Sequence, residues 1–286
     1  MKILDCFSFY NEKELLELRV KLLYDKVDLF VISDANRTHS GIPKEYTCKE
    51  IIKRFNLPKN KIEIVEVDLP GPEIETDNWN RERLQRNAAQ QYIDQNTVAI
   101  VSDCDEIIDP TFIDYYSSLA QNNPDNILRI PMSYLNCRAD LEVCDSNGNK
   151  RPWSAGFICL HNHIQKYTLS DIRESFSRGL NHIPFRDIYA IDNGTIQDAG
   201  WHFSWMGDTE RLKTKCRSFG HAHEIVHNAV APLYSNQMTE FLNNYRPTDG
   251  TTDPLGRNDH ILKSYPVEKL PQLIFENPNL KEFLLP

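Results

Sequence analysis

The first half of the chain alternates short, mostly apolar runs with segments of helical pattern, the first of which repeats leucine at helical spacing. We expect strands over residues 2–9, 27–33, 62–67 and 98–101, and helices over residues 15–23, 50–55 and 80–93. Because continuously apolar strands are typical of parallel sheets that are buried on both faces, this order predicts an α/β fold. Such a fold has a mostly parallel central sheet flanked by helices, and it binds ligands at the carboxyl ends of its strands.

The second half of the chain is less regular. We expect a strand over residues 127–134, a turn at Asp145-Ser146-Asn147-Gly148, and a segment over residues 153–161 that could pair with that strand in a hairpin. Prolines recur in the tail, which should wrap the surface in short pieces. The chain length fits one domain over residues 1–286, with a regular half (1–125) and an irregular half (126–286).

An acidic run, Asp103-Cys104-Asp105-Glu106, ends the fourth expected strand. Neighbouring carboxylates repel one another unless a cation is present. On an extended segment Asp103 and Asp105 share a face and Cys104 points away from them. Oxygen ligands of this kind suit Mg²⁺ or Mn²⁺ with a phosphate-bearing substrate. We therefore expect both aspartates to face a cleft, and a structure in which these two side chains turn away from any cleft or pair with arginines inside the fold would end the proposal of a cation.

A structural interpretation of the same run stays open. Asp109-Pro110-Thr111 has the composition of a helix N-cap and first turn, so the acids could form an ordinary loop before a helix.

Charge and apolar content limit the class of partner. The formal net charge is -9, which argues against nucleic acid and anionic membranes as main partners. No run reaches the length of a transmembrane helix, and the N-terminus lacks the apolar stretch of a signal peptide. A soluble, cytoplasmic protein is expected.

The seven cysteines are an odd number and form no CxxC pair. This spacing favours reduced thiols over a zinc ribbon or a disulfide framework, and a bridge between Cys137 and Cys144 is not expected.

A second metal motif competes with the acidic run. His223-Glu224-Ile225-Val226-His227 matches HExxH, in which two histidines on one helix face bind Zn²⁺ and the glutamate acts as general base. His221 adds an imidazole, and Glu240 is a possible third ligand. Pro232 would end such a helix soon after the motif. A zinc-dependent hydrolase is therefore an alternative.

Five segments carry a resemblance to a known family. They are residues 5–44, ERLQRNAA (82–89), VAIVSDCDEI (98–107), AGWHFSW (199–205) and SYPVEKLPQLI (264–274). In this order they resemble glycosyltransferase family 17, whose best-known members add a bisecting GlcNAc to glycoproteins. The resemblance implies a GT-A-like fold and transfer from a nucleotide-sugar donor, with UDP-GlcNAc suspected. It also implies Mn²⁺ or Mg²⁺, inversion at the anomeric carbon and a glycan acceptor. Residues 1–125 would then be the half that binds the nucleotide sugar, and residues 126–286 the acceptor-side half with its C-terminal wrap. Eukaryotic relatives carry a membrane anchor, and no such segment is seen in this sequence.

Carried over by residue, the resemblance assigns Asp103 and Asp105 to the DxD pair. Asp105 would be the direct metal ligand and Asp103 a contact to ribose or metal. His202 could complete the metal shell, although a core histidine bonded to backbone is an equal alternative. His221 is a further candidate ligand.

Asp34, Arg86 and Asn87 are the remaining candidates for the nucleotide, together with Asp103. Asp34 ends the second expected strand, where a loop-capping role is equally plausible. Arg86 and Asn87 could instead lie on an exposed helix face.

An inverting transfer needs a carboxylate that accepts the proton of the acceptor hydroxyl on the side opposite the leaving group. Asp198 is the first candidate for this base, followed by Glu106 and then Asp187. Trp201 and Trp205 could stack on a sugar ring, although large aromatic side chains more often lie in a core. Besides the transferase and the zinc hydrolase, a non-catalytic module that binds nucleotide sugars remains possible.

Overall fold

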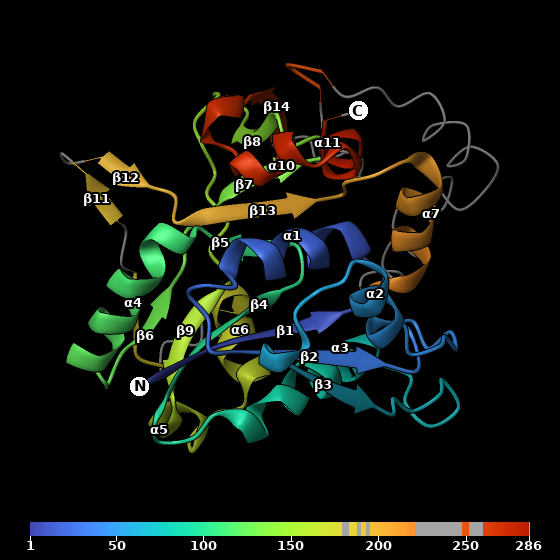
Figure 1. Cartoon of the computed structure of the whole chain (residues 1–286), viewed down its shortest axis with the longest axis vertical. Helices are drawn as coiled ribbons and strands as arrows, with labels where there is room; N and C mark the ends of the chain where they lie inside the picture. Colours follow the sequence, from blue (N-terminus) through green and yellow to red (C-terminus); the bar gives the residue numbers. More distant parts are fainter. Residues whose placement is uncertain (179–182, 188–189, 193–194, 221–247, 252–259, 286) are drawn as a thin grey trace.

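The computed structural model describes residues 1–178, 183–187, 190–192, 195–220, 248–251 and 260–285. Two sheets and the helices around them form a mixed α/β architecture (Figure 1). The predicted α/β class, with a mostly parallel central sheet flanked by helices, is confirmed.

The first sheet has seven strands in the order β10-β6-β9-β4-β1-β2-β3. Their bounds are Lys2–Phe9 (β1), Leu29–Ala35 (β2), Ile62–Val67 (β3), Thr97–Asp103 (β4), Ile127–Arg129 (β6), Phe157–Leu160 (β9) and Phe185–Asp187 (β10). Strands β1 to β4 are parallel to one another, and β9 runs antiparallel to both β4 and β6. All four strands predicted in the first half are therefore present.

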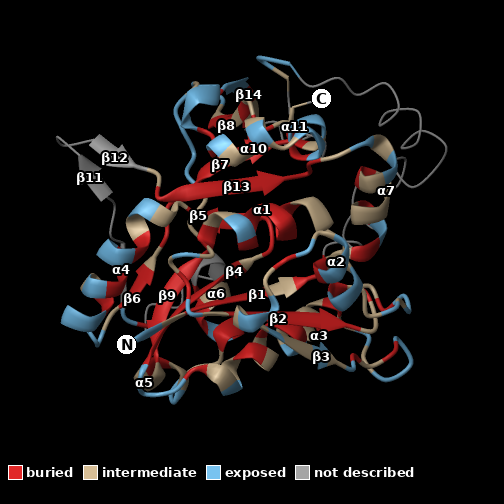
Figure 2. Cartoon of the chain, viewed as in Figure 1, coloured by how far each residue is buried: buried red, intermediate tan, exposed pale blue. Residues whose placement is uncertain are grey.

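Helices and alternating side chains build a core on each face of this sheet. On β1, Phe7 and Phe9 pack in a cluster with α1 (Lys13–Leu23), whereas Leu4 and Cys6 pack in a second cluster under α6 (Leu169–Arg178). The period of two along a strand separates the two sets. Figure 2 shows the resulting buried centre of the molecule. The other helices are α2 (Cys48–Arg54), α3 (Asn78–Asn87), α4 (Pro110–Asn122), α5 (His161–Ile164) and α7 (Thr209–Ser218), followed by α10 (Gln272–Glu276) and α11 (Pro278–Leu284).

The second sheet has five strands in the order β14-β8-β7-β13-β5. Their bounds are Glu106–Ile108 (β5), Ser133–Asn136 (β7), Leu141–Asp145 (β8), Gly200–Ser204 (β13) and His260–Ser264 (β14). Helix α1 lies between β13 and the first sheet (Figure 1). A short hairpin of β11 (Ala190–Asp192) and β12 (Thr195–Gln197) stands apart.

Short 3-10 helices cover residues 59–61, 88–92 and 267–269. The second of these ends the predicted helix over residues 80–93, so α3 stops at Asn87.

The two sequence halves share both sheets. Strands β6, β9 and β10 come from after residue 125 and complete the first sheet, while β5 comes from before it and joins the second. The assignment of nucleotide-sugar binding to residues 1–125 and of the acceptor side to residues 126–286 stays a prediction.

The predicted strand over residues 127–134 is wrong in extent. It splits into β6 and β7, which lie in different sheets. Pro131, between them, has no N–H to donate to a ladder, and its carbonyl accepts from the N–H of Ala199. The later segment does pair antiparallel with the first, because Leu128 lies opposite Ile158, but β8 is inserted between them.

The acidic run connects the two sheets. Strand β4 ends at Asp103 in the first sheet, Cys104 and Asp105 form a turn, and β5 begins at Glu106 in the second. Next to it, the N-cap predicted at Asp109 is confirmed, since its side chain accepts from the N–H of Thr111.

A buried ion pair anchors this turn from α1. Arg19 is fully buried and donates to both oxygens of Asp5, at 2.8 and 2.6 Å. Its guanidinium also donates to the carbonyl oxygens of Asp103 (2.7 Å) and Glu106 (2.9 Å). The backbone on both sides of Asp105 is thus fixed to α1 and β1.

All seven cysteines are buried and unbridged, as predicted. Among the described residues, each helix is too short or too polar to cross a bilayer.

Candidate active site

A cavity of about 400 Å³ opens where β1 and β4 end. Ser8, Phe9 and Asp103 reach it from these strands, and helices α3, α6 and α7 contribute Arg86, Arg173 and Lys215. The position is the one expected for ligand binding in an α/β sheet.

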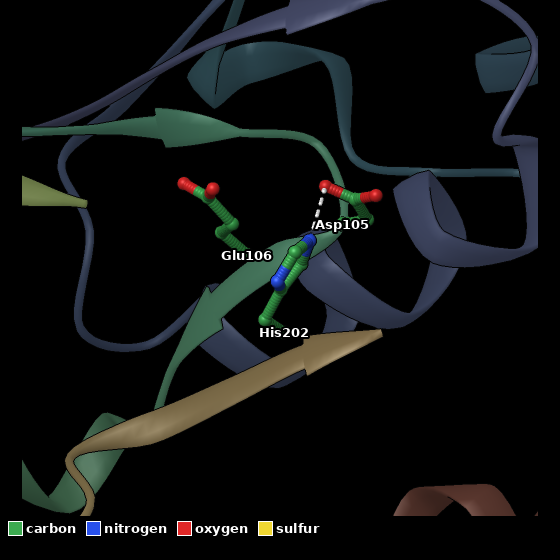
Figure 3. A group of neighbouring side chains, drawn as sticks. All are labelled: Asp105, Glu106 and His202. Atoms are coloured by element: carbon green, nitrogen blue, oxygen red, sulfur yellow. Dashed lines mark ion pairs between the residues drawn. The ribbon is translucent and has the colours of Figure 1, made fainter. Parts of the chain in front are cut away.

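Asp105, Glu106 and His202 converge at this cavity (Figure 3). One ligand atom from each lies within 4.8 Å of the others, and all three residues are buried. The register explains the grouping, because His202 on β13 lies directly opposite Glu106 on β5. Such pairs have their side chains on the same face of the sheet.

Asp105 is held by two basic side chains. His202 Nε2 lies 3.7 Å from Oδ1, and Lys215 Nζ lies 3.2 Å from Oδ2. Burial alone would raise the pKa of Asp105, but Lys215 and His202 outweigh it and hold the pKa well below its usual range. Asp105 is therefore ionised at neutral pH, as a metal ligand must be.

The imidazole of His202 packs against two aromatic rings that also contact each other. Tyr134 stacks on it with the ring centroids 5.0 Å apart, and Trp153 lies 4.5 Å away on centroids. Trp153 also donates its indole N–H to Glu106 Oε1 at 2.5 Å. His202 Nδ1 is buried and has no hydrogen-bond partner in the part of the chain that the structure describes. The position of two of the three candidate ligands is thus set by aromatic side chains.

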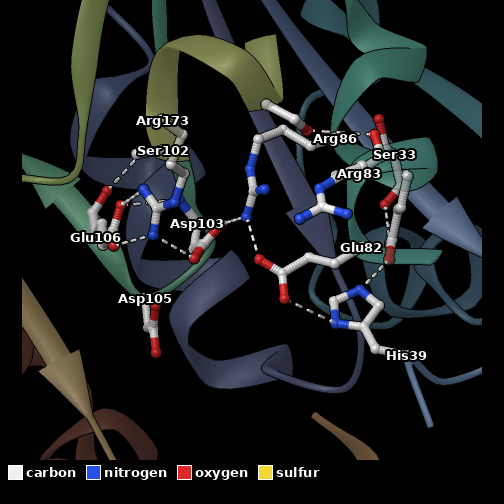
Figure 4. Close-up of polar contacts among 12 residues, drawn as sticks. Ser33, His39, Glu82, Arg83, Arg86, Ser102, Asp103, Asp105, Glu106 and Arg173 are labelled. Atoms are coloured by element: carbon white, nitrogen blue, oxygen red, sulfur yellow. Dashed lines mark hydrogen bonds and ion pairs between the residues drawn. The ribbon is translucent and has the colours of Figure 1, made fainter. Parts of the chain in front are cut away.

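Asp103 lies in a different environment (Figure 4). It accepts from Arg173 Nη2 at 2.5 Å and from Arg86 Nη2 at 3.2 Å. Arg86 also pairs with Glu82, and Arg173 also pairs with Glu106. Burial would raise the pKa of Asp103, but Arg173 and Arg86 outweigh it and lower the pKa.

The two aspartates of the DxD pair thus have separate partners, against the expectation that they point the same way. The reason is local, because the strand ends at Asp103 and Asp105 lies in the turn that follows. Both still line the cavity. The arginine pairing that would end the proposal is present at Asp103 and also at Glu106, whereas Asp105 pairs with no arginine among the described residues.

The charge on the cavity wall is unbalanced. Among the described residues that line it, six are carboxylates and three are lysine or arginine; the carboxylates are Glu12, Glu82, Asp103, Asp105, Glu106 and Glu174. An excess of negative charge attracts a cation and repels a free diphosphate.

Of the residues predicted to contact the nucleotide, Arg86 and Asp103 line the cavity and two others do not. Asp34 is buried and accepts from Lys44 Nζ and from the N–H of Cys48, each at 2.8 Å, so it orders the loop before α2. Asn87 accepts from the N–H of Ser170 and connects α3 to α6. Both hold loops or helices in place.

The aromatic run on β13 alternates as a strand should. His202 and Ser204 line the cavity, whereas Trp201 packs in the core and donates its N–H to the carbonyl of Lys269. Trp205 follows the strand and does line the cavity. Of the two tryptophans predicted to stack on a sugar, the structure brings only Trp205 there.

Asp198, the first candidate for the base, does not line the cavity. It accepts from Ser133 Oγ at 2.5 Å and pairs with Lys150. Glu106 does reach the cavity, but Arg173 pairs with it. Asp187 lies on β10, and its side chain is outside the part that the structure describes.

The HExxH motif at His223–His227, with His221 and Glu240, falls in residues 221–247, outside the described residues. The structure therefore does not bear on the zinc hydrolase.

Sequence reasoning missed Arg173, Lys215, Tyr134, Trp153 and Glu12. All five line the cavity. Lys215 and Arg173 lie about 70 to 110 positions from their acidic partners, so no local pattern could have paired them. A weak signal existed for Tyr134, which ends the second-half strand predicted over residues 127–134.

One comparison, with known protein families, agrees with the resemblance. Residues 1–132 match the model of Glycosyltransferase family 17, a segment that includes the whole acidic run. The resemblance to this family is confirmed, and it supports a glycosyltransferase. No curated protein matches the chain significantly.

Three solved structures are similar to this one. A 4-diphosphocytidyl-2C-methyl-D-erythritol synthase from Anaerococcus prevotii has a TM-score of 0.38 and 8% identity, covering 68% of this chain and 92% of its own. TarS from S. aureus has a TM-score of 0.40 and 13% identity, covering 71% and 61%. A mannose-6-phosphate isomerase from Helicobacter pylori has a TM-score of 0.37 and 12% identity, covering 70% and 91%.

Proposed function

We propose that this chain, whose residues 1–132 match glycosyltransferase family 17, is a metal-dependent, inverting glycosyltransferase. It would move a sugar from a nucleotide-diphosphate sugar to a hydroxyl group of a glycan. The observation that carries the proposal is the convergence of Asp105, Glu106 and His202 at the cavity.

The donor set of these three residues fits a divalent cation. Two carboxylates and one imidazole suit Mn²⁺, and Mg²⁺ accepts the same oxygen ligands. The buried, unpartnered nitrogen of His202 and the excess of negative charge on the wall are both costly without a positive ligand. We place the cation with Asp105, Glu106 and His202, because Asp103 is paired with two arginines and Glu106 with one of them, Arg173.

The cation would offset the charge that grows on the departing diphosphate. The chain's own residues prepare the rest of the site. Because the wall carries excess negative charge, a diphosphate should bind well only together with the divalent cation. Arg86 lines the cavity, and its Nη1 forms no hydrogen bond to a described residue that would block a phosphate oxygen.

A base is still needed for the acceptor hydroxyl. Glu106 is a proposed ligand of the cation, and Asp198 does not line the cavity. Glu12 is the remaining acid of interest, because it lines the cavity and forms no ion pair with a described residue. One of its oxygens accepts from the N–H groups of Tyr10 and Asn11, which fixes the carboxylate. We therefore assign the base to Glu12.

UDP-GlcNAc is the donor suggested by the family, and the aromatic side chains of Trp205 and Trp153 at the cavity can pack against a sugar face. The acceptor follows from the same resemblance as a glycan hydroxyl.

The test is a transfer and donor-hydrolysis assay over a set of nucleotide sugars, with and without Mn²⁺, in which NMR identifies the product anomer. We expect turnover of a UDP-sugar only with the metal, and an inverted product. Asp105→Asn should abolish both metal dependence and turnover, whereas Glu12→Gln should keep UDP binding and lose transfer.

Retention at the anomeric carbon, or equal turnover after chelation, would contradict the mechanism. Tight binding of nucleotide sugar with no hydrolysis of any donor would instead favour a non-catalytic module.

A further inference from the structure

Among the described residues, three cationic side chains line the cavity, and they differ in how tightly the protein holds them. Arg86 is shared by Glu82 and Asp103, and Arg173 is shared by Asp103 and Glu106. Their side chains are 4% and 10% exposed. Two carboxylates on each guanidinium fix both arginines in place.

Lys215 is held differently. Its ammonium makes one ion pair among the described residues, 3.2 Å from Asp105 Oδ2, and its side chain is 31% exposed. The ammonium also lies 5.4 Å from the centroid of Trp205. A lysine carries its charge on a flexible four-carbon stem, so this cation can change partners at little cost.

The partner of Lys215 is the carboxylate that we assign to the metal. An ammonium group and a divalent cation that bind the same carboxylate repel each other. Asp105 therefore cannot pair fully with Lys215 and with the metal at the same time. At the same time, a metal-bound diphosphate brings new negative charge into the cavity that Lys215 also lines. The ammonium would then lose one anionic partner and gain another.

We propose that Lys215 is the resident counter-cation of Asp105, which leaves this carboxylate when the divalent cation binds and then contacts the diphosphate of the donor. The inference rests on the proposed function. Lys215 therefore weakens metal binding in the absence of nucleotide and strengthens nucleotide binding in the presence of metal.

The test measures two affinities of the purified full chain for Lys215→Met. Removing a positive charge beside Asp105 should tighten Mn²⁺ binding without nucleotide by about three- to tenfold, as measured by calorimetry or by the EPR signal of free Mn²⁺. The same change should weaken UDP binding at saturating Mn²⁺ by about tenfold, the typical contribution of a hydrogen bond to a charged group.

Lys213→Met is the matched control. It removes a lysine from the same helix, and Lys213 pairs with Glu210 and does not line the cavity. Both affinities should stay at the wild-type value. Lys215→Arg should retain part of the UDP affinity, because it keeps the charge.

Because the affinities for Mn²⁺ and for UDP are expected to change in opposite directions, the test distinguishes this role of Lys215 from a structural one. A damaged fold would weaken both affinities of Lys215→Met, and unchanged or weaker Mn²⁺ binding in a variant with wild-type thermal stability would overturn the inference. If the wild type itself binds no Mn²⁺, the metal-dependent function fails instead.

Discussion

Single side chains set the geometry of the candidate site through contacts with residues that are distant in sequence. Trp153 is the clearest case, because it touches His202 with its ring and Glu106 with its N–H. Groups that orient metal ligands without binding the metal commonly alter metal affinity by a factor of about 10 to 100. Trp153 is therefore expected to matter although it offers no ligand atom.

Trp153→Phe should lower Mn²⁺ affinity by about tenfold, because Glu106 loses one of the two side chains that donate to it, the other being Arg173. Trp201→Phe is the control, since its N–H donates to the carbonyl of Lys269 and its ring lies in the core. That variant should lose about 1 kcal/mol of unfolding free energy and keep its Mn²⁺ affinity. Equal Mn²⁺ affinities in the two variants would argue against an orienting role for Trp153.

Asp105 also predicts a pH dependence of stability. Its pKa is lowered in the folded protein, so its ion pairs stabilise the fold above the ordinary aspartate pKa, and this stabilisation is lost as the pH falls through the lowered value. Urea unfolding of the wild type and Asp105→Asn should show a stability difference at pH 7 that shrinks below about pH 4. A difference that grows on acidification would mean that Asp105 is not ionised in the folded state.

The sequence located the acidic run correctly and misjudged its geometry. The apolar run before Asp103 predicts a strand, so the acids belong at its carboxyl end. The alternation rule then fails at the next residue, because Asp105 lies in a turn. Arg173 and Lys215 could not be predicted as partners, since nothing local in the sequence relates them to these acids.

At the scale of elements, the turn between β4 and β5 depends on α1. Arg19 crosses from this helix and binds Asp5 together with the two carbonyl groups that flank the turn. A buried charge left without its partner is costly, whereas removing both partners is often nearly neutral.

Arg19→Leu should therefore lower the unfolding free energy by about 3–5 kcal/mol, because Asp5 would be left buried and unpaired. The double variant Asp5→Leu/Arg19→Leu should recover part of this loss. Urea unfolding measures both, and a double variant less stable than Arg19→Leu would show that the pair itself is strongly stabilising.

Element boundaries show what local pattern cannot decide. The four parallel strands of the first half were predictable, because each is a mostly apolar run between polar segments. The split at Pro131 was not, since the change of sheet depends on where Ala199 and β13 lie. Gly200 has a similar role: a Cβ there would lie 2.3 Å from the carbonyl oxygen of Ile107, so glycine permits β13 to approach β5.

At the scale of the whole molecule, the candidate site forms where two sheets meet. The acidic turn leaves the first sheet and enters the second, and β13 brings His202 beside it from nearly one hundred residues away. Neither sheet alone holds all three candidate ligands. The class of fold could be predicted from the first half, but the third ligand depends on the register of β13 against β5, which involves residues distant in sequence.

The most direct measurement is a crystal structure of the protein with Mn²⁺ and UDP, with the metal located by its anomalous scattering. We expect one strong peak within bonding distance of Asp105, Glu106 and His202, with the diphosphate bound to the same ion and Asp103 still paired with Arg86 and Arg173. A metal coordinated by Asp103 without Asp105, or UDP bound in the cavity with no ion beside it, would contradict the account.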